Sequence, residues 1–349
     1  MNIRETLKKY VGNNFFIRKI LYYQRWSPEL AYRNCFLLTK EEKIPLKIKF
    51  EMIRALFIYG CAYDEFFFFD FYNHKENKYR KEFITDALGY TYFEKLNKYK
   101  NLALFDNKFE TYKLFKDFYK RKLISFRGDN EELDNFLKTC PIFMAKVGNS
   151  SCGSGIEILN VNKFESVSLL IAYMKSRNYD VCEELIIQSE QMSRLHPASV
   201  NTIRITTIVV NSTENPDIVL FHPFLKIGQQ GNYVDNGGKG GIIVKIDVAT
   251  GKLCTDGCDE ANHRYKIHPN TGIKLRGYQI PDWEQAKELA KELALVVPEN
   301  RYIGWDLAHT NEGWVMVEGN ARGQFVGQQM CDVVGKRREF EEIIKRIEE

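Results

Sequence analysis

The feature that most constrains the fold of this chain is a β-hairpin that its sequence predicts near the C-terminus. Tyr302–Ala308 and Trp314–Glu318 are runs rich in apolar, aromatic and β-branched residues, and Asn311-Glu312-Gly313 between them is typical of a turn. Both runs are too apolar for two solvent-exposed strands, so the hairpin is expected to lie within a covered sheet. Any fold for the chain must therefore place this antiparallel pair in its interior.

Polar residues interrupt this apolar hairpin at matching places. With a turn centred on Glu312, Asp306 falls opposite Glu318, and the two-residue period of a strand puts Asn320 on the same face. Two carboxylates and an amide oxygen are a donor set that suits Mg²⁺ with phosphates completing its shell, and it is the wrong set for zinc. The alternative is a hairpin with polar residues on a solvent face. We favour the metal, because acids aimed into an apolar layer need a counter-charge.

The rest of the chain divides into two parts that differ in predicted secondary structure. Residues 1 to about 100 are predicted to be mostly helical and rich in aromatic side chains, with Phe66–Phe69 as a buried segment. From about residue 140, short β-branched runs alternate with turns, which favours an α+β fold with largely antiparallel sheets. Helices are expected at Lys108–Arg121, Phe164–Ser176, Trp283–Val296 and Lys336–Glu349. Further strands are expected at Ile142–Val147, Ile156–Leu159, Val181–Ile187, Thr202–Val210, Ile218–Ile227 and Gly241–Ile246.

Composition excludes several classes of protein. A hydrophobic content of 44% and a charged content of 28% exclude a disordered or fibrous chain, and a net charge of +4 does not require a nucleic-acid partner. The eight cysteines are irregularly spaced, which favours reduced thiols over a disulfide framework, and Cys254 and Cys258 lack the second pair that a zinc site needs. Neither a secretory signal nor an apolar run long enough to cross a bilayer is visible. We expect a soluble, cytoplasmic protein.

A loop between residues 144 and 155 is the second candidate for chemistry. Lys146 lies near the end of a predicted strand and is followed by the sequence Val147-Gly148-Asn149-Ser150-Ser151-Cys152-Gly153-Ser154-Gly155. Glycines allow bare N–H groups to approach phosphate oxygens, small hydroxyls add donors, and the lysine adds charge. No Gly-Lys-Ser/Thr closes the loop, and a strand follows it, so it is neither a P-loop nor a dinucleotide fingerprint. A plain glycine hairpin remains an alternative.

Weaker candidates lie between these two segments. Glu183 and Glu184 lie within the strand expected at Val181–Ile187, which could offer backbone groups to an adenine and carboxylates to a ribose. Arg204 and Lys226 sit inside β-branched runs, where a cation needs either a carboxylate partner or a phosphate. Residues 233–241 form a glycine-dense loop that is either a mobile flap or a flexible hairpin.

Read in order, these segments resemble the ATP-grasp superfamily, and within it the sugar-transfer-associated ATP-grasp proteins. The resemblance covers roughly residues 100–330, with a looser likeness across the helical N-terminus. The phrases that carry it are DNKFETYKLF (106–115), FMAKVGNSSCGSGIEIL (143–159), EELIIQ (183–188), SVNTIRIT (199–206), LKIGQQGNYVDNGGKGGIIVKID (225–247) and YIGWDLAHTNEGWVMVEGN (302–320).

The resemblance implies a nucleotide held between two α+β subdomains. The implied division is a helical region at 1–100, a small subdomain at 101–188, a large subdomain with the metal site at 189–335 and a charged helix at 336–349. The implied site residues are Lys108 and Lys146 at ATP; Gly148, Ser150, Ser151 and Gly153 in the phosphate loop; Glu184, Leu185 and Ile187 near adenine; Glu190 as a candidate for ribose; Arg204 and Lys226 at the transferred phosphate; and Asp306, Glu318 and Asn320 at magnesium.

The family implies ATP and Mg²⁺ as cofactors and a reaction that activates a carboxylate as an acyl-phosphate before passing it to an amine. The expected substrates are small molecules: an amino acid or other amine, and a carboxylate-bearing sugar or precursor of a surface polysaccharide. One alternative is a kinase that phosphorylates a hydroxyl. Another is a non-catalytic nucleotide-binding module of a glycan-assembly complex, whose basic N-terminus docks peripherally on a membrane or a glycosyltransferase.

Overall fold

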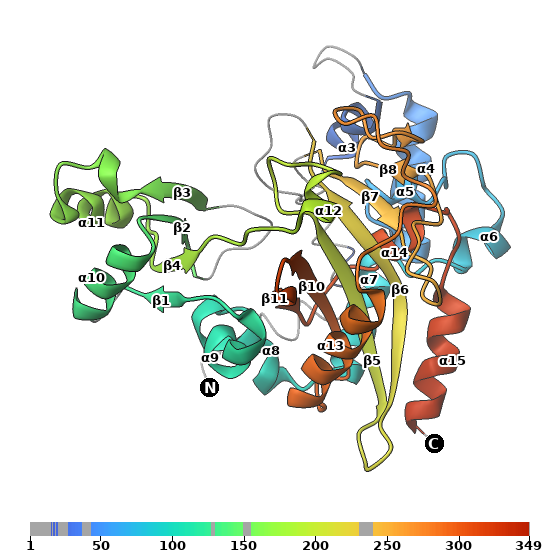
Figure 1. Cartoon of the computed structure of the whole chain (residues 1–349). Coiled ribbons are helices and arrows are strands. Elements are labelled where there is room, and N and C mark those ends of the chain that lie inside the picture. The colour runs from blue at the N-terminus through green and yellow to red at the C-terminus, as the bar shows by residue number, and fades with distance from the viewer. Residues whose placement is uncertain are drawn as a thin grey trace.

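The computed structural model describes residues 15, 17, 19, 27–36, 43–126, 130–148, 155–229 and 240–348, and among these it places two antiparallel sheets. A four-stranded sheet projects from one side of the molecule, at the left of Figure 1, and a seven-stranded sheet forms the centre of the larger part. Helices cover both sheets, which confirms the predicted α+β class. None of the helices in the described ranges combines the length and the apolar character that crossing a bilayer requires.

The four-stranded sheet has the order β1-β4-β2-β3, and each neighbouring pair is antiparallel. Two helices pack on it through a core of apolar side chains that includes Phe136, Phe143 and Leu170. The strands are β1 (Leu123–Ser125), β2 (Ile142–Lys146), β3 (Ile156–Asn160) and β4 (Val181–Glu184); the helices are α10 (Asn130–Thr139) and α11 (Val167–Ser176), with a 3₁₀ turn at Val161–Lys163.

The seven-stranded sheet has the order β11-β10-β5-β6-β7-β8-β9, again antiparallel throughout. Its largest core cluster joins β5, β6, β7 and β10 to helices α9 and α13 and contains Trp305, which is fully buried. The elements are β5 (Thr202–Asn211), β6 (Asp217–Ile227), β7 (Ile242–Lys245), β8 (Gly257–Cys258), β9 (Arg264–Tyr265), β10 (Tyr302–Thr310), β11 (Gly313–Asn320), α9 (Lys108–Tyr119), α12 (Glu190–Ser193) and α13 (Trp283–Val296).

The helical N-terminal region and the C-terminal helices complete the larger part. Phe66–Phe69 are all buried, as predicted, in an aromatic cluster that also includes Phe71 and Phe83. A second cluster packs α7 and α15 against β5, β6 and β10. The helices are α3 (Pro28–Phe36), α4 (Leu46–Tyr59), α5 (Glu65–Phe68), α6 (Asn77–Lys81), α7 (Asp86–Leu96), α8 (Tyr99–Phe105), α14 (Val326–Met330) and α15 (Arg337–Glu348).

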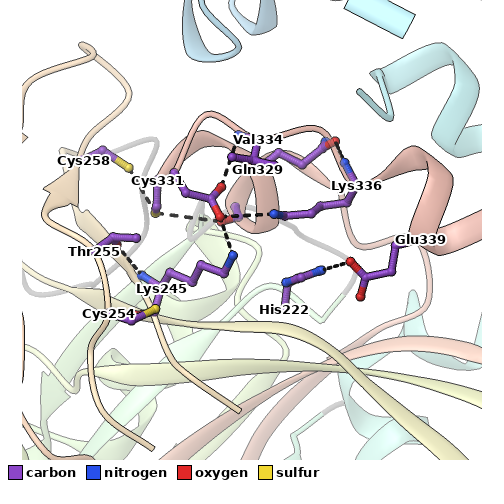
Figure 2. A network of polar contacts seen from close by, with 12 residues as sticks. His222, Lys245, Cys254, Thr255, Cys258, Gln329, Cys331, Val334, Lys336 and Glu339 are labelled. Atoms are coloured by element: carbon purple, nitrogen blue, oxygen red, sulfur yellow. Dashed lines mark hydrogen bonds and ion pairs between the residues drawn. The ribbon is translucent and has the colours of Figure 1, made fainter. Parts of the chain in front are cut away.

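A network of charged side chains fastens the segment between α14 and α15 to strand β7, as Figure 2 shows. Lys245 from β7 and Lys336 both donate to Asp332, the latter at 3.2 Å, and all three side chains are at most one-fifth exposed. Because two lysines share one carboxylate, the pKa of Asp332 is lowered in spite of its burial. Beside this network, the sulfur atoms of Cys258 and Cys331 lie 3.2 Å apart.

The main secondary-structure predictions agree with the observed elements, apart from the ends of several segments and some short pieces. Strand β4 ends at Glu184 instead of Ile187, and α11 begins at Val167 instead of Phe164 because the Ser166 side chain accepts the N–H of Leu169 and caps the helix. Helix α9 begins at Lys108, as predicted, and the Asn107 side chain caps it by accepting the N–H groups of Phe109 and Glu110. Strand β1 and helix α10 were not predicted.

Candidate active site

The hairpin of β10 and β11 brings Asp306 opposite Glu318, as predicted, but by a different route. The turn consists of two residues, Asn311 and Glu312, and is not centred on Glu312. A two-residue turn alone would place Val317 opposite Asp306. The pairing shifts by one residue between Asp306 and Leu307, where β11 contains one extra residue. This irregularity brings the two carboxylates opposite each other.

Asp306 is a buried carboxylate bracketed by two cations of the same sheet. It is 1% exposed; its Oδ1 accepts from Arg204 Nε at 2.7 Å, and its Oδ2 accepts from Lys226 Nζ at 3.0 Å and from Arg204 Nη2. Arg204 stands directly across from Asp306 on β5, and Lys226 is on β6. Burial alone would raise the pKa of Asp306, but Arg204 and Lys226 hold it well below the usual range. The carboxylate is therefore ionised across the physiological range of pH.

Glu318 and Asn320 extend this cluster toward solvent. The Glu318 side chain is 47% exposed, and its Oε1 lies 4.0 Å from Arg204 Nη2. Asn320 Nδ2 lies 3.4 Å from Glu318 Oε1 and 3.5 Å from Asp306 Oδ2, so all three side chains share one face of the hairpin, as predicted. Desolvation by the surrounding protein, and then the negative charge of Asp306, raise the pKa of Glu318. A carboxylate whose ionised form is disfavoured gains from a nearby cation.

The donor set of this face fits a magnesium ion. Two carboxylates and the amide of Asn320 supply hard oxygen ligands, and a half-turn of that amide replaces its nitrogen with its oxygen. Among the described residues, Asp306 Oδ1 accepts from Arg204 alone and retains one lone pair for a cation, whereas Oδ2 already accepts from both Arg204 and Lys226. Within the described ranges, no group of three or more His, Cys, Asp or Glu side chains could hold a metal, so the site depends on Asn320.

A second bracketed carboxylate lies on the four-stranded sheet, and the sequence analysis missed its role. Glu183 on β4 is 3% exposed and pairs with Lys146 Nζ on β2 and with Arg121, whose Nε donates at 2.7 Å. Burial would raise the pKa of Glu183, but Arg121 and then Lys146 lower it to about 2. The strand register offered a signal: Glu183 stands across from Met144, so Glu183 and Lys146 share a face.

Lys108 links the two sheets. It is the first residue of α9, its Nζ donates to the carbonyl of Val147 at 3.4 Å, and its N–H donates to the carbonyl of Gly148. Burial lowers the pKa of Lys108, while the charge of Glu318 raises it and that of Lys146 lowers it. Lys108 therefore lies within electrostatic reach of residues on both sheets. The charges of the predicted phosphate lysines Lys108 and Lys146 and of the predicted metal ligand Glu318 therefore act on one another.

The loop after β2 is described in part. The N–H of Gly148 donates to Asp180 Oδ1 at 2.5 Å, so a phosphate would have to displace that carboxylate to reach this donor. Predicted donors Ser150, Ser151 and Gly153 lie outside the described residues, as does most of the predicted flap at 233–241.

The predicted adenine segment forms the connection from the four-stranded sheet to the larger part. Glu184 Oε2 accepts the N–H of Lys122 at 3.0 Å, Leu185 is half-buried, and Ile187 is 77% exposed. Glu190 opens helix α12, and its side chain is 84% exposed and paired with Arg194. These four residues lie along the connection. Among the described residues, no contact joins any of them to Asp306.

A hydrogen-bonded chain that the sequence analysis did not identify anchors the end of this connection. His309 on β10 is buried; its Nδ1 lies 2.9 Å from Ser189 Oγ and its Nε2 lies 2.9 Å from Asp282 Oδ2. Ser189 caps helix α12, and its N–H donates to the carbonyl of His309. The three residues are far apart in the sequence and have no motif spacing, so only the fold brings them together.

Comparisons with known proteins agree with this architecture. The sequence model of the sugar-transfer associated ATP-grasp family matches residues 88–345. Similar solved structures include the ATP-grasp ligase PsnB complexed with a phosphomimetic variant of its minimal precursor, Mg and ADP (15% identity, 76% of this chain and 67% of that chain, TM-score 0.44). Others are D-alanyl-alanine synthetase A from Vibrio cholerae (11% identity, 70% and 64%, TM-score 0.41) and VanG D-Ala:D-Ser ligase from Enterococcus faecalis (14%, 70% and 61%, 0.41). None of the curated proteins matches the chain.

Proposed function

Because this chain belongs to the sugar-transfer associated ATP-grasp family, we propose that it is an ATP-dependent carboxylate–amine ligase that works through an acyl-phosphate. The observation that supports this most strongly is the cluster of Asp306, Glu318 and Asn320 beside Arg204 and Lys226 on one face of the seven-stranded sheet. Cations next to a hard-oxygen donor set are what a transferring phosphoryl group requires.

The proposed chemistry needs positioning and charge, with no protein nucleophile. A carboxylate oxygen of the substrate attacks the γ-phosphorus of ATP, and the bond to the departing ADP oxygen breaks. The amine nitrogen then attacks the acyl carbon, phosphate leaves with the electron pair of the C–O bond, and the amine loses a proton to solvent. When bound, Mg²⁺ would neutralise charge on the phosphates, and Asp306, Glu318 and Asn320 would hold it.

The residues of this chain would contribute fixed charge at two places. Arg204 and Lys226, which both pair with Asp306, would stabilise negative charge that develops on the transferred phosphoryl group. Lys108 and Lys146 would hold the other phosphates from the side of the four-stranded sheet, where Glu183 keeps Lys146 in place. We further propose that Glu184, Leu185 and Ile187 border the adenine, and that Glu190 binds the ribose.

The substrates proposed are an amine, such as an amino acid, and a carboxylate-bearing sugar or polysaccharide precursor. We suggest an ADP-release screen that pairs amino acids with uronic-acid sugars, run with the intact chain, Mg²⁺ and ATP. Glu318→Gln serves as the blank, because its half-exposed side chain can be neutralised without opening the core. Asp306→Asn is a second blank whose folding must be checked, since Asp306 is buried.

The screen distinguishes three outcomes. A ligase releases ADP only when both substrates are present and yields a product without phosphorus. A stable phosphorylated product with one substrate would instead identify a kinase. Binding of Mg-ATP with no pair stimulating release above the Glu318→Gln blank would contradict the ligase proposal and leave a nucleotide-binding module.

A further inference from the structure

Helix α4 exposes a row of large apolar side chains on its outer side. The exposed fractions are 72% for Leu46, 70% for Phe50, 49% for Ile58 and 38% for Phe57. At about 100° per residue, these four positions fall within roughly one-third of the helix circumference. The opposite side is packed into the aromatic core through Met52, Ala55 and Leu56, each at most 1% exposed. The apolar row is therefore held on a fixed helix and is not part of the core.

Basic side chains share this exposed arc. Lys47 and Arg54 are exposed and lie among the apolar positions, and Lys43 is exposed just before the helix. The single acid in α4 is Glu51, which stands at the border of the arc and lies 3.4 Å from Arg80 and 3.7 Å from Arg54. The surrounding region has the same bias, since residues 1–60 contain twelve Lys or Arg and five Glu, with no Asp. The arc thus combines apolar contact area with a positive field.

The exposed side of α4 is not part of the candidate active site. In Figure 1, α3 and α4 lie at the upper right, at the opposite end of the molecule from the four-stranded sheet. The described residues of the preceding segment reach the C-terminal end of α4: Lys19 Nζ donates to the carbonyl of Phe57 at 2.7 Å, and Phe15 packs against Gly60. Leu46 and Phe50, at the N-terminal half of the helix, remain about 70% exposed.

We propose that α4 is a peripheral docking helix that binds the surface of an anionic phospholipid bilayer. An amphipathic helix with bulky apolar side chains flanked by lysine and arginine lies in the interface, where its apolar face enters the acyl boundary and its cations meet lipid phosphates. The positive charge of the arc favours an anionic partner, and the apolar row requires that partner to have an apolar layer beneath its charged surface. An anionic bilayer supplies both.

The test is co-sedimentation of the full chain with vesicles of phosphatidylcholine alone and of phosphatidylcholine with about 30% phosphatidylglycerol. We expect binding to the anionic vesicles alone. The double variant Lys47→Gln/Arg54→Gln should weaken it about fivefold for each charge removed, and Leu46→Gln/Phe50→Gln should weaken it at least about tenfold. The matched control is Leu169→Gln/Lys138→Gln, which removes an exposed apolar residue and an exposed lysine from the four-stranded sheet region. It should bind as the unchanged chain does.

A second measurement keeps the test decisive if a double variant misfolds. Phe50→Trp preserves the apolar contact and should show a blue-shifted emission, quenched by brominated lipid, in anionic vesicles and not in neutral ones. No binding by the unchanged chain would overturn the proposal, as would equal binding by the α4 variants and the control. Loss of self-association in Leu46→Gln/Phe50→Gln, without vesicle binding by the unchanged chain, would overturn it in favour of an interface between copies.

Discussion

Two buried carboxylates, Glu183 on the four-stranded sheet and Asp306 on the seven-stranded sheet, are each bracketed by one arginine and one lysine. The group around Glu183 is closed, since none of its side chains is more than 11% exposed. The group around Asp306 is open on one side, where Glu318 is 47% exposed and Asn320 contacts both carboxylates. The same arrangement of charges is thus enclosed on one sheet and reachable from solvent on the other.

The difference predicts its largest effect at Glu183. Replacing it by Gln leaves Arg121 and Lys146 as buried cations without a counter-charge, so we expect the free energy of unfolding to fall by about 3–5 kcal/mol. Urea unfolding measures this. Glu184→Gln is the matched control, because its half-exposed side chain accepts one backbone N–H, which an amide can also do. A loss below about 1 kcal/mol for Glu183→Gln would mean that the closed group is not a support.

Glu318→Gln should change the stability of the chain little and its activity strongly. The change retains the shape of a side chain that is already half exposed and whose ionised form is disfavoured, so the free energy of unfolding should change by less than about 1 kcal/mol. Substrate-dependent ADP release should fall about 100-fold, because a charge that stabilises the transferring phosphoryl group through the metal is lost. Steady-state kinetics and urea unfolding on the same preparation test both parts. Unchanged release would remove Glu318 from the proposed site.

The contributions of Glu183 and Glu318 to stability should change with pH in opposite directions. The pKa of Glu183 is about 2 in the folded chain and near 4.5 ordinarily, so its contribution is complete above pH 4.5 and is lost as the pH falls toward 2. The stability difference between the unchanged chain and Glu183→Gln should therefore shrink by ~2 kcal/mol between pH 5 and pH 3.

The corresponding difference for Glu318→Gln should move the other way. Glu318 has a raised pKa, so its ionisation costs stability that appears as the pH rises through that value. The unchanged chain should lose stability relative to Glu318→Gln over that rise. Urea unfolding across pH 3 to 7 tests both curves, and parallel curves for the two variants would contradict the distinction.

The comparison also shows what the sequence could and could not predict. Period-two spacing found the open group, because Asp306, Glu318 and Asn320 lie close together in the chain and differ sharply from their apolar neighbours. The closed group could not be predicted in the same way, because Arg121 precedes a three-residue strand that is too short to predict. Long-range pairing with no local signal, as between Glu183 and Arg121, depends on tertiary packing.

His309 stands where the connection between the two regions is anchored. His309→Ala removes hydrogen bonds to Ser189 and Asp282 and leaves the buried Ser189 hydroxyl without one partner, so we expect a loss of about 2 kcal/mol in the free energy of unfolding. If the connection positions ATP, the KM for ATP should rise while kcat changes little. His263→Ala is the control, because His263 also pairs with an aspartate but is 45% exposed. Equal effects of the two variants on KM would argue against a positioning role.

The smallest effect is expected at Glu190, which tests whether the open group extends along the connection. The Glu190 side chain is 84% exposed and its partner Arg194 is 63% exposed, so solvent screens the pair and Glu190→Gln should leave the urea midpoint unchanged. As a ribose ligand, however, Glu190 would accept hydrogen bonds from the sugar hydroxyls, and its replacement should raise the KM for ATP about fivefold without lowering kcat. Arg194→Gln separates the two roles, since it breaks the same ion pair but removes no acceptor. If both variants leave KM unchanged, the ribose acceptor lies elsewhere, and helix α12 is not part of the proposed site.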